Sequence, residues 1–92
     1  MSSSQTGYWS DWKDADAEVK EICSKIKPVV EKKMGHDFPV FDALNYQQQI
    51  VKGRNYNIKV YAGNNQCVII LVWQKLDGEL ELTTARKVPL PE

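Results

Sequence analysis

Residues 14–34 read DADAEVKEICSKIKPVVEKKM, and their apolar side chains recur at steps of three and four residues. This spacing places the apolar side chains on one face of an α-helix and leaves the charged ones for solvent. Asp14 or Asp16 can cap the amino end, and Gly35 can end the helix in a left-handed conformation. The sequence therefore predicts one long amphipathic helix with an apolar stripe made of Val19, Ile22, Cys23, Ile26, Val30 and Met34.

After Pro39 the apolar residues alternate with polar ones, which is typical of strands with one buried face. Glycine-containing turn signals separate these segments, and Asp77-Gly78 is a strong hairpin signal because both residues tolerate a positive φ. Strands are expected at residues 40–50, 54–62, 67–75 and 79–84. One helix followed by antiparallel strands predicts an α+β fold, with the helix packed across a twisted sheet of four to five strands.

The composition restricts the class of protein. A chain of 92 residues has room for one core, so residues 1–92 are predicted to form a single domain. Hydrophobic residues make up 42% of the chain, which excludes a disordered protein. The 12 basic and 12 acidic residues balance, and no apolar run approaches the roughly 20 residues that span a bilayer. We therefore expect neither a nucleic-acid nor a membrane partner.

Residues that could carry chemistry are few. Cys23 and Cys67 each lie in an apolar segment, where a thiol stays protonated and unreactive. His36 is the only histidine, and the sequence has neither a metal-ligand cluster nor a phosphate-binding loop. The sequence thus predicts a protein that is not an enzyme and holds no metal or cofactor. Free thiols and an amino-terminal segment unlike a signal peptide predict a cytoplasmic location.

Residues 1–13 are predicted to form a flexible amino-terminal arm, because they show no apolar period. Tyr8, Trp9 and Trp12 are unusual in such an arm, since free tails seldom carry three aromatic residues. They indicate that the arm docks on a surface. We expect that surface to be the core of the same domain, with an external partner as the alternative.

The segment Gln49-Ile50-Val51-Lys52-Gly53 falls where the first hairpin must turn. Hairpin tips are normally polar, yet Ile50 and Val51 bring apolar side chains to this one, and Gly53 supplies backbone freedom. Apolar residues on a short turn contribute little to a core. Their position favours a wedge that enters a cleft on another protein.

This segment resembles the stefins, the type 1 cystatins that inhibit papain-like cysteine proteases. The stefin pattern Q-x-V-x-G is matched by Gln49, Val51 and Gly53 within QQQIVKGRNYNIKV. FPVF at residues 38–41 also matches the family, and Gly7 precedes Glu18 by the eleven residues that separate the stefin glycine from the helix start. Further matches lie along the next strand and at the helix end: Asn55, Tyr56, Ile58, Lys59, Val60, Lys27-Pro28 and Glu31-Lys32.

The resemblance implies a cystatin-like fold and a mechanism. In the family an amino-terminal trunk and two hairpins fill the cleft of the protease on both sides of its catalytic cysteine. They present no peptide bond for attack, so inhibition is reversible, tight and non-covalent. The partners implied are papain-like proteases of the cathepsin type. On this chain the residues implied to bind the protease are Gly7, Gln49, Ile50, Val51, Lys52, Gly53, Leu76, Asp77 and Gly78.

The chain departs from the family at the proposed contacts. Gln5 and Thr6 stand where family trunks often have apolar residues. Lys52 stands where the family usually has alanine, and Asp77 stands where it usually has proline. The alternative is therefore a binding or self-assembling protein of the same fold with weak or lost inhibition.

The third predicted strand is apolar on both faces. Alignment with the preceding strand predicts that Val68, Ile70 and Val72 point toward the helix, which leaves Ile69, Leu71 and Trp73 on the outer face. Self-association through this face would make the protein a homodimer rather than a monomer. Coverage by the aromatic arm or by residues 88–91 is the other interpretation. We expect coverage by residues 88–91.

Overall fold

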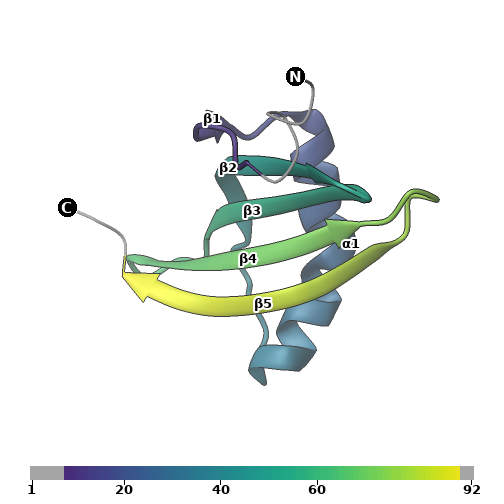
Figure 1. The fold of residues 1–92 in the computed structure, drawn as a ribbon. Coiled ribbons are helices and arrows are strands. Elements are labelled where there is room, and N and C mark those ends of the chain that lie inside the picture. The colour runs from purple at the N-terminus through teal and green to yellow at the C-terminus, as the bar shows by residue number, and fades with distance from the viewer. Residues whose placement is uncertain (1–7, 90–92) are drawn as a thin grey trace.

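The computed structural model describes residues 8–89, and within them the chain forms one helix and one antiparallel sheet (Figure 1). The elements are β1 (Lys13–Asp14), α1 (Ala17–Met34), β2 (Asp42–Val51), β3 (Gly53–Tyr61), β4 (Gln66–Gln74) and β5 (Leu80–Pro89). The strands lie in the sheet in the order β1-β2-β3-β4-β5, with α1 across one face. The predicted α+β fold is confirmed.

The helix begins and ends at capping residues. The Asp16 carboxylate accepts a hydrogen bond of 2.9 Å from the Val19 amide, so Asp16 rather than Asp14 is the amino-terminal cap. Gly35 has a φ of 80° and donates its N–H to the Glu31 carbonyl at 2.9 Å, as the sequence predicts. Within the described part of the chain, no helix has the length and apolar character needed to cross a membrane.

The core lies between α1 and the sheet face that it covers. The helix contributes its apolar stripe, and Phe38 adds a buried ring from the segment after the helix. The predicted inward residues of β4, Val68, Ile70 and Val72, are completely buried. Burial of such side chains contributes about 1.5–3 kcal/mol each, so the two-residue period of the strands holds the sheet against the helix. The other buried members from the sheet are Tyr46, Tyr56, Ile58 and Val60.

Strand β5 is longer than the sequence indicates. It continues past Thr84 to Pro89, and its last residues pair with Cys67 and Gln66 of β4. The expectation that residues 88–91 fold over the outer face is therefore wrong for Val88 and Pro89, while Leu90 and Pro91 lie outside the described residues. The physical reason is that the first half of β4 would otherwise leave its backbone groups unpaired.

The outer face of β4 carries Ile69, Leu71 and Trp73, each partly buried. Their neighbours across the strands are mostly polar. Ile69 lies between Lys59 and Arg86, and the other two residues have similar flanks. The apolar stripe on this face is therefore one strand wide, with polar side chains on both sides.

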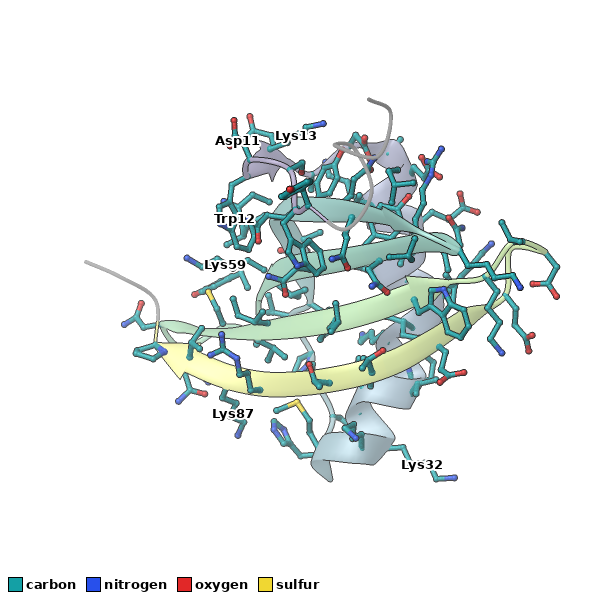
Figure 2. All side chains as sticks on the ribbon, viewed as in Figure 1. Asp11, Trp12, Lys13, Lys32, Lys59 and Lys87 are labelled. Atoms are coloured by element: carbon teal, nitrogen blue, oxygen red, sulfur yellow. The ribbon has the colours of Figure 1, made fainter. Side chains whose placement is uncertain are left out.

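The amino-terminal arm follows the edge of β2. The Ser10 amide donates to the Gln48 carbonyl at 2.9 Å, and the Ser10 hydroxyl oxygen accepts from the Gln48 amide at 3.0 Å. Tyr8, Trp9 and Trp12 stay 68%, 38% and 45% exposed. The expectation that these rings enter the core is wrong, because the arm satisfies backbone groups at the β2 edge while other side chains fill the core. Figure 2 shows Trp12 at this rim of the sheet.

Basic side chains are spread over the molecule. Lys13, Lys32, Lys59 and Lys87 belong to β1, α1, β3 and β5, and Figure 2 shows them at separate places. These four side chains do not line one groove of the kind that follows a nucleic-acid backbone.

Candidate functional site

The first hairpin joins β2 to β3 in a tight turn. Val51 pairs with Gly53, which leaves Lys52 at the tip. Gly53 has a φ of 94°, and a Cβ atom there would overlap the backbone carbonyl oxygen of Gln74. Glycine is therefore required here for two reasons, the left-handed backbone and the close approach of β4. The turn places Ile50, which is 40% exposed, beside the tip.

Side-chain contacts support the strands that carry this tip. The Asn55 amide nitrogen donates to the Gln49 side-chain oxygen at 2.8 Å, and Asn57 donates to Gln47 in the same way at 3.2 Å. Both pairs lie on the outer face of β2 and β3. They give the predicted site residue Gln49 a positioning role within the hairpin.

The second hairpin joins β4 to β5 through residues 75–79. The Gly78 amide donates to the Lys75 carbonyl at 2.9 Å, and the Asp77 carboxylate accepts from the Glu79 amide at 2.9 Å. Asp77 thus replaces the family's proline with a side chain that closes the turn by a hydrogen bond. Leu76 projects from this loop and is 75% exposed.

The two hairpins lie at the same end of the sheet, opposite the β3–β4 turn (Figure 1). A shallow surface hollow forms between them. The structure thus brings the predicted site residues on the two hairpins together at one edge, while Gly7 lies outside the described residues. The hollow is lined by Glu18, Ile50, Val51, Gly53, Arg54, Gln74, Lys75, Leu76 and Gly78.

Three residues of this edge were missed from the sequence. Glu18 and Arg54 line the hollow, and Trp73 donates its indole N–H to the Lys52 carbonyl oxygen at 2.9 Å. Arg54 directly follows the matched motif, and this position in the sequence could have indicated that it lies at the site. The contact of Trp73 depends on the pairing of β3 with β4, which no local pattern reveals.

The candidate reactive residues Cys23, Cys67 and His36 do not line this hollow. Burial raises the pKa of the Cys23 thiol to about 12, so this thiol stays protonated at neutral pH. Cys67 is a buried free cysteine, and the His36 ring packs against the Phe38 ring at a tilt of 57°, with ring centroids 4.4 Å apart. Among residues 8–89 no group of three or more His, Cys, Asp or Glu could hold a metal ion. The fold and the site therefore define a small α+β protein that presents two hairpins at one end of its sheet.

Comparison with known proteins identifies its family. The model of the cystatin domain matches residues 7–88, so the chain belongs to the cystatin family. Cystatin-A from Homo sapiens is 39% identical over 75 residues, which cover 82% of this chain and 76% of the relative. Stefin-C from Bos taurus is 40% identical over 73 residues, which cover 79% of this chain and 72% of the relative. Leukocyte cysteine proteinase inhibitor 1 from Sus scrofa is 42% identical over 70 residues, which cover 76% of this chain and 68% of the relative.

These relatives confirm the resemblance to the stefins. They bear the names of a cystatin, a stefin and a proteinase inhibitor rather than of enzymes. The prediction that the chain is not an enzyme is thereby confirmed.

Proposed function

We propose that this protein is a reversible, tight-binding, non-covalent inhibitor of papain-like cysteine proteases of the cathepsin type. The observation that supports the proposal is the position of the two hairpins at one edge, where exposed Ile50 and Leu76 flank a common hollow. A relative named as a leukocyte cysteine proteinase inhibitor adds to it. The proposed contacts are Gly7 on the trunk, Gln49 to Gly53 on the first hairpin and Leu76 to Gly78 on the second.

The proposed mechanism is a preformed wedge. The tip of the first hairpin enters the cleft above the catalytic cysteine of the protease, and the trunk and second hairpin bind on either side. A rigid tip loses little conformational entropy on binding, so the apolar contact of Ile50 and Val51 is turned into affinity. The tight turn at Gly53 keeps the backbone at the tip from adopting the extended form that a protease cleaves.

The test is inhibition of papain and of cathepsins by the full chain. We expect competitive inhibition, full recovery of protease activity on dilution, and release of the inhibitor uncut, as shown by its intact mass. Absence of inhibition would support the alternative, a binding or self-assembling protein of the same fold. A covalent adduct or a cleaved chain would contradict the wedge mechanism.

We also propose a cytoplasmic location. The support is chemical, since Cys23 and Cys67 are buried free thiols. Free thiols persist where glutathione and thioredoxin keep cysteines reduced.

The trunk is expected to contribute little to affinity. Gln5 and Thr6 bring small apolar area to the cleft, so deletion of residues 1–6 should weaken inhibition of papain less than about tenfold, mainly through a faster dissociation rate. Association and dissociation rates measured for the full and the shortened chain test this. A loss of several orders of magnitude would show that the trunk binds by contacts other than apolar burial.

The protein is proposed to be a monomer, because polar neighbours flank its outer apolar residues. Sedimentation of the parent and of Leu71→Lys should therefore give monomers in both cases, with Thr84→Lys as a control on the neighbouring strand. Leu71 is only partly buried, so we expect the substitution to lower the free energy of unfolding by about 1 kcal/mol. A dimeric parent that Leu71→Lys dissociates would contradict the proposal and assign the outer face to self-association.

A further inference from the structure

Trp73 lies on the outer face of β4, apart from the proposed contact residues, yet it contacts the first hairpin directly. Its indole Nε1–H donates to the backbone carbonyl oxygen of Lys52 at 2.9 Å. The strand register places Trp73 opposite Asn55, so the side chain reaches along the sheet from β4 to the turn at Lys52. The carbonyl group that it holds belongs to the residue at the very tip of the proposed wedge.

The same ring also contacts the second hairpin. The Lys75 ammonium group lies 5.5 Å from the ring centroid of Trp73, within the range of a cation–π interaction. Lys75 forms ion pairs with Glu79 at 3.7 Å and with Glu81 at 3.4 Å. One hollow is lined by Lys52, Trp73, Lys75, Leu76 and Asp77. Trp73 therefore joins the tip of one hairpin to the loop of the other.

The hydrogen bond acts on the turn residue of the first hairpin. Lys52 stands between Val51 and Gly53, which form the last pair of the β2–β3 ladder, and the conformational freedom of glycine allows the Lys52–Gly53 peptide plane to rotate. A donor fixed on β4 holds the Lys52 carbonyl in one orientation. Each backbone conformation removed before binding lowers the entropy lost when the tip enters a cleft.

We propose that Trp73 is a positioning residue that holds the first hairpin tip in its binding conformation and fixes that tip relative to the second hairpin. Its consequence for inhibition rests on the proposed function. Phenylalanine at this position removes the indole donor and part of the ring area, and it keeps an aromatic ring beside Lys75. Trp73→Phe therefore removes the hydrogen bond to Lys52 while most of the ring packing remains.

The first test uses the free protein. In Trp73→Phe, the amide order parameters of Lys52 and Gly53 measured by NMR relaxation should fall from about 0.85 toward 0.6, while those of β3 stay unchanged. Trp12→Phe is the matched control, because Trp12 is 45% exposed and lies on the arm away from the tip. Unchanged order parameters at the tip of Trp73→Phe would overturn the proposal.

The second test measures inhibition of papain by the same variants. The dissociation rate of Trp73→Phe should rise about three- to tenfold, as expected for one lost hydrogen bond, with the association rate unchanged. A mobile tip with an unchanged dissociation rate would overturn the positioning role. If the parent does not inhibit at all, the proposed function fails, and the order parameters still decide whether Trp73 holds the tip.

Discussion

Val51→Asp should weaken inhibition of papain by about 100- to 1,000-fold and leave the fold intact. Val51 lies at the tip of the first hairpin, paired with Gly53 at the end of the ladder. In the free protein a carboxylate at this position reaches water. In a protease cleft it would lose that water without gaining a partner, and the cost appears only in the complex. Inhibition constants for the two proteins measure the effect.

Val29→Asp is the matched control. Val29 is a helix residue that is 47% exposed, so the same substitution adds the same charge away from both hairpins. We expect it to inhibit as the parent does. Equal inhibition by the parent and Val51→Asp would show that the first hairpin does not enter the cleft.

Gly53→Ala should lower the free energy of unfolding by about 2–4 kcal/mol and should weaken inhibition as well. The φ of 94° is unfavourable for alanine, and the added methyl group would overlap the Gln74 carbonyl oxygen. Relief of this overlap requires the turn to move away from β4. That movement displaces the tip that carries Val51. Urea denaturation and papain inhibition measure the two effects separately.

Gly78→Ala separates the two causes. Gly78 has a nearly identical φ of 92°, but a Cβ atom there would meet nothing within 4 Å. The free energy of unfolding of Gly78→Ala should therefore fall only by the cost of the left-handed backbone, about 1–2 kcal/mol. An equal loss of stability in both variants would show that the approach of Gln74 to Gly53 is not what requires glycine in the first hairpin.

The fold could be predicted because its strongest signals are local. The stripe on α1 and the alternation in β3 each specify a buried face within one segment, and both faces are found in the core. The helix start was less certain because Asp14 and Asp16 both suit a cap. Asp14 lies in β1 and pairs with Asn45 of β2. Asp16 also accepts a hydrogen bond of 3.2 Å from the Tyr46 hydroxyl. Contacts between segments distant in the sequence therefore determine that Asp16 is the cap.

The end of β5 could not be predicted for a related reason. Residues 85–89 show little alternation, and Pro89 is a weak strand former. Their strand conformation follows from β4, which provides a partner up to Gln66. Proline is tolerated there because β5 is the last strand in the sheet order.

The candidate site could be predicted in part. A motif and turn signals mark residues 49–53 and 76–78 in the sequence as two hairpins, and the structure places both hairpins at one end of the sheet. The sequence shows Trp73 only as part of an apolar stripe. Its hydrogen bond to Lys52 could not be predicted, because that bond depends on the register of β3 and β4. The rings of the arm were placed in the core because their apolar area suggested burial, whereas the edge of β2 binds the backbone of the arm instead.

Amide hydrogen exchange, measured on the free protein and on its complex with papain, will show whether the two hairpins bind the protease together. We expect added protection at residues 49–53 and 76–78, which lie at one end of the sheet. Residues 63–65, in the β3–β4 turn at the opposite end, should exchange as they do in the free protein. Protection at residues 63–65 with none at the two hairpins would contradict the claim.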